Sequence, residues 1–87
     1  MGIFRVIKRV MTGEVIQQID ATANGGATTM SLRLKRDRGS GDQYVVLAAT
    51  SAGNYQYFEF DRDEFDLFSH AVEAIQNSLK QSGPPNG

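Results

Sequence analysis

The basic side chains of this 87-residue chain are concentrated in its first half, where they would form a surface that attracts anions. Seven of the nine lysines and arginines fall into two groups, Arg5, Lys8 and Arg9, then Arg33, Lys35, Arg36 and Arg38. Clustered lysine and arginine neutralise phosphates and release counterions, which drives much of nucleic-acid affinity. The second group therefore contains candidate phosphate contacts. The alternative is a charged edge strand that resists aggregation between sheets.

Three tyrosines, Tyr44, Tyr55 and Tyr57, offer flat rings in the segments that follow the second basic group. A tyrosine ring stacks on a nucleic-acid base with about 1–3 kcal/mol per base, whatever the base is. Cross-strand aromatic packing, or a contact between two copies, explains Tyr55 and Tyr57 as an alternative. Glu59 has the same strand parity as these two tyrosines, and a carboxylate on their face would repel phosphate.

The acidic residues gather in the second half, so the formal net charge of −1 hides a marked asymmetry. Six of the ten are Glu59, Asp61, Asp63, Glu64, Asp66 and Glu73. Their spacing does not match an EF-hand loop, and the chain has one histidine and no cysteine, so we expect no metal site. His70 is expected on the surface or at a dimer interface, because its neighbour Ser69 points in another direction on a helix.

No catalytic or cofactor motif is recognisable. The glycine-containing segment RGSGDQ, residues 38–43, lacks the Gly-Lys-Ser/Thr ending of a phosphate-binding loop. Without a paired nucleophile and base, a metal cluster or a cofactor motif, we expect a protein that is not an enzyme and uses no cofactor. The start of the sequence lacks a long apolar run, so we expect an intracellular protein, cytoplasmic or nuclear, without membrane contact.

Strand patterns separated by turn residues occupy most of the first 60 residues. Residues 28–38 alternate, with Met30, Leu32 and Leu34 on one face and Arg33 and Lys35 on the other. Strands are also expected at 14–23, 43–50 and 55–60, with turns at 24–26, 39–42 and 52–54. An extra strand at 3–10 is an open alternative. The last strand should direct Phe58 and Phe60 into the core.

A single amphipathic helix is predicted to follow the last strand. Asp61 is a suitable N-cap, Glu64 completes a capping box, and Phe60 can pack on Phe65. An apolar stripe then recurs at spacings of three and four, and must be buried against the sheet or against a second copy. Its candidate dimer-interface residues are Phe68, Val72, Ile75 and Leu79. We expect one α+β domain, residues 1–81, of ββββα order with a curved antiparallel sheet of four to five strands, and a tail at 82–87.

The segment FEFDRDEFDLFSHAVEAI, residues 58–75, resembles the end of the Pur-type single-stranded nucleic-acid-binding fold, which positive-cofactor-type coactivators and whirly proteins share. The resemblance implies a homodimer formed through helices and strand ends. It also implies single-stranded DNA or RNA bound on the exposed face of the sheet by basic and aromatic residues. On this sequence that face would carry Arg33, Lys35, Tyr44, Tyr55 and Tyr57.

Two functions follow as hypotheses. The first is a small, non-catalytic homodimer that binds single-stranded DNA or RNA across its sheet. The alternative is a protein-interaction or assembly module that dimerises through its sheet and helix and presents a surface to a protein partner. The near-neutral total charge and the apolar residues on both faces of residues 44–49 motivate this alternative.

Overall fold

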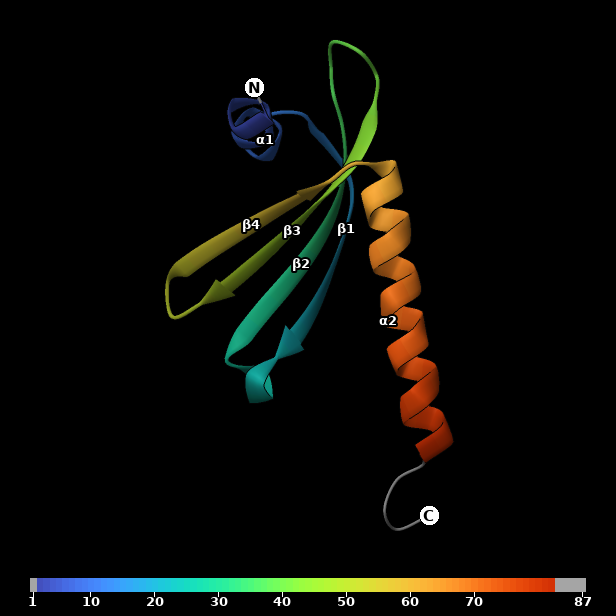
Figure 1. Cartoon of the computed structure of the whole chain (residues 1–87). Helices are drawn as coiled ribbons and strands as arrows, with labels where there is room; N and C mark the ends of the chain where they lie inside the picture. Colours follow the sequence, from blue (N-terminus) through green and yellow to red (C-terminus); the bar gives the residue numbers. More distant parts are fainter. Residues whose placement is uncertain (1, 83–87) are drawn as a thin grey trace.

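The computed structural model describes the backbone of residues 2–82 and the side chains of residues 7–81. Its elements follow one another in the order helix, four strands, helix (Figure 1). They are α1 (Gly2–Met11), β1 (Glu14–Ala23), a 3-10 turn η1 (Asn24–Gly26), β2 (Thr28–Arg36), β3 (Gln43–Ser51), β4 (Asn54–Phe60) and α2 (Arg62–Ser82). The predicted tail begins at Ser82, the last residue of α2, and its remainder, residues 83–87, lies outside the described part.

The four strands form one open antiparallel sheet in the order β1-β2-β3-β4. The predicted α+β class and the ββββα order are therefore confirmed. Short turns join neighbouring strands, and the turn between β3 and β4 places Ala52 and Gly53 at φ 50° and 82°. Positive φ at both central residues matches the type I′ geometry that suits the right-handed twist of a two-residue hairpin.

The extra strand considered for residues 3–10 is wrong, because this segment is the helix α1. The β-branched residues that favour a strand also fall at helical spacing, as Ile3, Ile7 and Val10 do. At the end of the helix, the backbone N–H and the hydroxyl of Thr12 both donate to the Lys8 carbonyl, at 2.8 and 2.6 Å. Gly13 then turns the chain at φ 86°, a conformation that glycine adopts without strain.

Strand pairing divides the side chains between two faces of the sheet. The polar face carries Gln18, Asp20, Ser31, Arg33, Lys35, Tyr44, Val46, Ala48, Tyr55, Tyr57 and Glu59. The apolar face carries Ile19, Leu32, Leu34, Val45, Leu47, Phe58 and Phe60. The largest fully buried side chains, Tyr44 and Val46, lie on the polar face. Phe58 is 49% exposed, so the expectation that it fills the core of a single chain is wrong.

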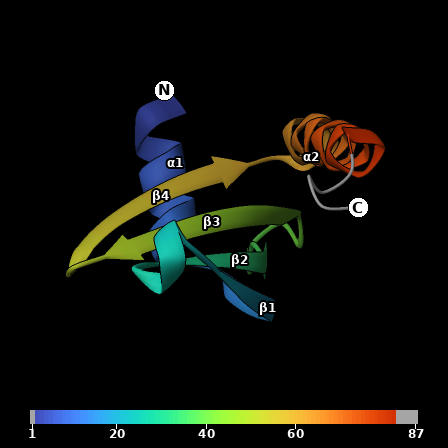
Figure 2. The same cartoon turned by 90° about the horizontal axis from the view of Figure 1, so that it is seen from below.

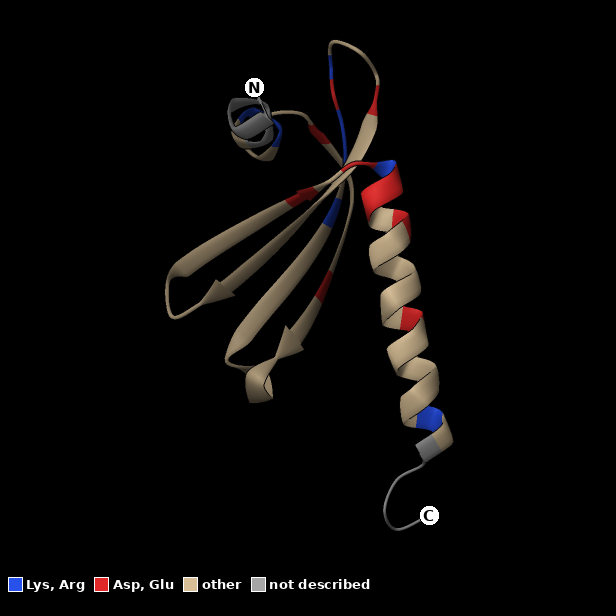
Figure 3. Ribbon diagram, viewed as in Figure 1, with Lys and Arg blue, Asp and Glu red and all other residues tan. Residues whose placement is uncertain are grey.

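The capping box predicted for the second helix is present at the start of α2. The Asp61 carboxylate accepts from the Glu64 N–H at 2.9 Å, and the Glu64 carboxylate accepts from the Asp61 N–H at 3.0 Å. The Phe60 ring contacts those of Phe65 and Phe68, with centroids 5.8 and 5.1 Å apart. Figure 3 shows how the acidic residues gather at this end of the helix. They lie where the macrodipole favours negative charge.

Beyond its first turns, α2 runs clear of the strands (Figures 1 and 2). Phe68, Val72, Ile75 and Leu79, the predicted stripe, are 38, 51, 65 and 68% exposed. An amphipathic helix gains most of its stability by burying such a stripe. In the single chain, the sheet contacts this stripe at Phe68 and leaves the rest of it uncovered.

Candidate nucleic-acid interface

An exposed pair of aromatic rings marks the outer strand of the polar face. Tyr55 and Tyr57 are 61% and 42% exposed, because β4 is an edge strand and the sheet continues on one side of it only. They are two residues apart on β4, so their side chains share one face. Their rings stack with centroids 6.2 Å apart and planes within 5°. This arrangement presents two flat surfaces of the kind on which unpaired bases stack.

Arg33 lies on the same face, two strands away from the tyrosines. It pairs with Val46 on β3, which in turn pairs with Glu59 on β4. Its Nε is 3.4 Å from the Ser31 hydroxyl, to which it donates, and its side chain is partly exposed. The neighbouring Asp20 has a lowered pKa because Ser31 donates a hydrogen bond to it, with a smaller contribution from Gln18. The open part of the polar face therefore combines one accessible guanidinium with two aromatic rings.

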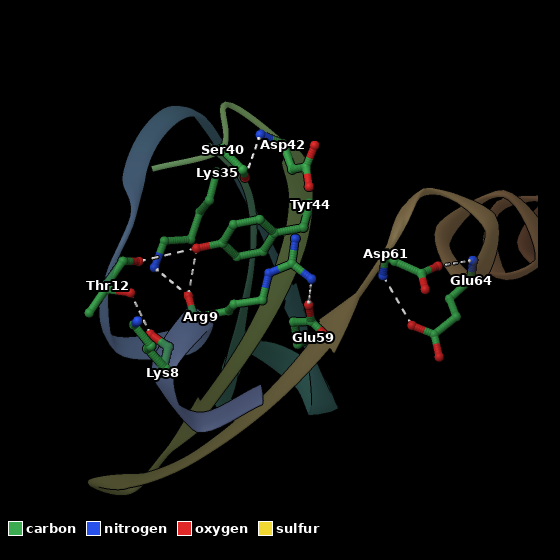
Figure 4. A network of polar contacts seen from close by, with 10 residues as sticks. All are labelled: Lys8, Arg9, Thr12, Lys35, Ser40, Asp42, Tyr44, Glu59, Asp61 and Glu64. Atoms are coloured by element: carbon green, nitrogen blue, oxygen red, sulfur yellow. Dashed lines mark hydrogen bonds and ion pairs between the residues drawn. The ribbon is translucent and has the colours of Figure 1, made fainter. Parts of the chain in front are cut away.

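Lys35 and Tyr44 also lie on the predicted face, directly opposite each other, but α1 covers them (Figure 4). Their exposed fractions are 5% and 2%. Lys35 Nζ donates to the Arg9 and Val10 carbonyls at 3.2 and 2.9 Å, and the Tyr44 hydroxyl donates to the Arg9 carbonyl at 2.8 Å. Neither side chain is accessible to a phosphate or a base in this arrangement.

Burial disfavours the charged form of both covered groups and shifts the pKa of each accordingly. It lowers the pKa of Lys35, with a smaller contribution from the nearby Arg33. It also raises the pKa of Tyr44, against the smaller opposing effect of the Arg9 charge. Both side chains therefore bind the C-terminal end of α1 to the sheet.

Arg36 and Arg38 lie away from the open part of the polar face. Arg36 donates to Glu14 across the β1–β2 ladder at 2.8 Å, an exposed ion pair that lowers the Glu14 pKa. Arg38 lies in the exposed turn between β2 and β3. The structure thus brings together Arg33, Tyr55 and Tyr57, and separates the other predicted site residues from them.

Arg9 is the residue that the sequence reasoning did not place in the site. Its guanidinium nitrogen lies 2.9 Å from the Glu59 carboxylate, in a pair whose side chains are only 14% and 5% exposed. The same guanidinium sits 4.2 Å above the Tyr44 ring centroid. The carboxylate expected to repel phosphate is therefore neutralised within the fold. The Arg5, Lys8 and Arg9 cluster was visible in the sequence, but nothing local to it indicated Glu59 as a partner.

A groove of about 620 Å³ lies between the opposite face of the sheet and the start of α2. Its apolar lining comes from Ile19, Leu32, Leu34, Val45 and Phe65. Ile19 and Phe58 remain 59% and 49% exposed, so the outer strands of the apolar face are open, whereas Leu47 at its centre is buried. The molecule thus has two uncovered apolar surfaces, this face and the stripe of α2.

Neither a metal cluster nor a membrane span is found in the described part of the chain. Residues 2–82 contain no group of three or more histidine, cysteine, aspartate or glutamate side chains able to hold a metal ion. No helix among them is long and apolar enough to cross a membrane. No protein-family model, curated protein or solved structure matches the sequence or the fold.

Proposed function

We propose that this protein binds single-stranded DNA or RNA on its polar face, as a non-catalytic homodimer. The observation that carries the proposal is the exposed, stacked pair Tyr55 and Tyr57 on the same face as Arg33. Stacking on the two rings supplies affinity for any base, and the guanidinium attracts the phosphate backbone. The neutralised Glu59 removes the charge that would oppose this binding.

The separation of Arg33 and Tyr57 on the sheet allows one nucleic-acid strand to contact both residues. Arg33 and Tyr57 are separated by two strand spacings and two residues of rise, which places their Cα atoms about 12 Å apart. A long arginine side chain and a base stacked on the ring can bridge that distance. One strand of nucleic acid would contact the polar face at Tyr57 and at Arg33, on either side of the buried Val46 and Ala48 of β3.

Fluorescence anisotropy with a labelled, unstructured oligonucleotide at two salt concentrations tests the proposal. Binding should be micromolar or tighter at low salt and weaken steeply as salt rises. Tyr57→Ala should weaken binding with little effect on the salt slope, whereas Arg33→Ala should reduce that slope. Lys80→Ala, on the last turn of α2, removes the same charge away from the polar face and is the control. No binding at low salt would refute the proposal.

Homodimerisation is proposed from the two uncovered apolar surfaces. Both surfaces belong to the same chain. In a dimer, the α2 stripe of each copy can therefore pack on the apolar face of the other copy. Fully burying a valine, leucine, isoleucine or phenylalanine contributes about 1.5–3 kcal/mol. Covering the four half-exposed stripe residues in both copies therefore supplies an energy comparable with the cost of association, roughly 4–15 kcal/mol.

Light scattering over a range of protein concentrations tests the dimer. Ile75→Asp places a charge in the stripe and should shift the protein toward monomer. Asn77→Asp introduces the same charge on the opposite side of the helix and should leave the dimer intact. A monomer at high concentration would contradict homodimerisation.

The exposed apolar face also favours a second candidate function, a module that binds a protein partner instead of a second copy. A monomer that fails to bind single strands, but keeps protein partners after nuclease treatment, would favour this candidate.

A further inference from the structure

Glu59 occupies a critical position for any phosphate that approaches the polar face. It lies two residues from Tyr57 on β4, on the tyrosines' side of the sheet. Its side chain is 5% exposed, so water screens its charge poorly. A buried carboxylate that loses its partner is costly, and it also repels a phosphate bound nearby.

The neutralising partner of Glu59 comes from a distant part of the chain. Arg9 belongs to the last turn of α1, and its 2.9 Å contact with Glu59 is an ion pair without hydrogen-bond alignment. The Arg9 Nε is buried and lacks a hydrogen-bond partner among residues 7–81. The pair alone is therefore a weak anchor for the helix.

Lys35 and Tyr44 hold the end of α1 in place through its carbonyl groups. Both donate to the carbonyl of Arg9 (Figure 4). Lys35 also donates to that of Val10. Carbonyls at a helix C-terminus lack partners within the helix and carry partial negative charge, so they suit a buried ammonium group.

Two apolar side chains at the described end of α1 add little to this attachment. Ile7 and Met11, on the described part of α1, remain 53% and 76% exposed. Among residues 7–81, the contacts that hold the end of α1 on the polar face are polar and converge on Arg9.

We infer that α1 sets the charge of the polar face. Arg9 cancels the Glu59 carboxylate, and Lys35 and Tyr44 are positioning residues that hold Arg9 in place. This inference rests on the proposed binding of single strands, and it assigns Lys35 and Tyr44 an indirect role in place of direct contact. The face then accepts phosphate only while α1 is docked.

Neutral substitutions of Arg9 and Glu59, made singly and together, separate this role from direct contact. In the anisotropy assay at low salt, Arg9→Ala should weaken binding on the order of tenfold, because Glu59 is then unpaired. Glu59→Gln should bind at least as tightly as the parent protein. The double variant Arg9→Ala/Glu59→Gln should recover affinity to within about threefold of Glu59→Gln.

Lys8→Ala is the matched control, because Lys8 is an exposed basic residue of the same helix. The loss of affinity caused by Lys8→Ala should be small, and Glu59→Gln should not change it. Lys35→Met and Tyr44→Phe should each weaken binding, and Glu59→Gln should rescue both. Circular dichroism and urea unfolding of each variant verify that the compared proteins are folded.

The outcomes distinguish this inference from the proposed function. If the parent protein binds but Glu59→Gln does not rescue Arg9→Ala, then Arg9 contacts the nucleic acid directly and the inference is overturned. If Lys35→Met alone resists rescue, Lys35 is itself a phosphate contact and its positioning role is wrong. If neither the parent protein nor Glu59→Gln binds single strands, the proposed function fails and the inference fails with it.

Discussion

Gly13 connects α1 to the sheet at a position where a side chain should not fit. A Cβ added there would overlap the Tyr44 hydroxyl and lie 3.3 Å from the Arg36 carbonyl oxygen. The backbone is also at φ 86°, which costs a residue with a side chain about 1–2 kcal/mol. Overpacking adds typically 1–3 kcal/mol. Gly13→Ala should therefore lower the free energy of unfolding by roughly 2–5 kcal/mol, a large share of the stability of a domain this size.

Gly53→Ala is the matched control, because Gly53 has φ 82° and a Cβ there meets nothing within 4 Å. Urea denaturation at one fixed protein concentration measures both variants, and the difference between them isolates the collision with Tyr44. Tyr44→Phe removes the colliding oxygen, so Gly13→Ala should cost less in that background. If Gly13→Ala is no more destabilising than Gly53→Ala, the close approach of Tyr44 to the end of α1 is wrong.

Three further predictions concern turns and caps. Ala52 has φ 50° in the β3–β4 turn, so Ala52→Asn should stabilise the fold by about 0.5–1 kcal/mol, seen as a higher urea midpoint. Asp37 accepts from the Gly39 and Ser40 N–H groups, which lower its pKa below the ordinary 3.8. The contribution of the Asp37 carboxylate to the free energy of unfolding is thus present above about pH 4 and is lost as the pH falls through the lowered pKa. Asp37→Asn should reduce that acid sensitivity in urea titrations at pH 2–5. Asp61→Ala removes the N-cap of α2 and should cost about 0.5–2 kcal/mol and reduce the helical signal in circular dichroism.

Short-range features of the fold could be predicted from the sequence because nearby residues encode them. Alternation in residues 28–36 indicates which side chains share a face, and the pairing agrees with it. Asp61 and Glu64 satisfy each other's backbone N–H groups three residues apart, so the start of α2 is readable from one short segment. The helix α1 was harder to predict from the sequence, because its valines and isoleucines suit a strand and a helix equally.

The candidate interface was predictable only in part. Strand parity by itself determined that Arg33, Tyr55 and Tyr57 share a face, since side chains alternate along every strand. Parity placed Lys35 and Tyr44 there as well. Only the tertiary structure decided that these two are buried, because the chain path brings the Arg9 and Val10 carbonyls onto them from about 25 to 35 residues away.

The charge of Glu59 and the exposure of α2 likewise depend on contacts across the fold. Sequence spacing cannot reveal that Arg9 neutralises Glu59, because the pair joins residues 50 positions apart, with β1, β2, β3 and most of β4 between them. The apolar stripe of α2 was evident from its periodicity, whereas its separation from its own sheet was not. Local sequence determines which face of a helix is apolar. Which surface covers that face depends on the direction in which the helix leaves the sheet.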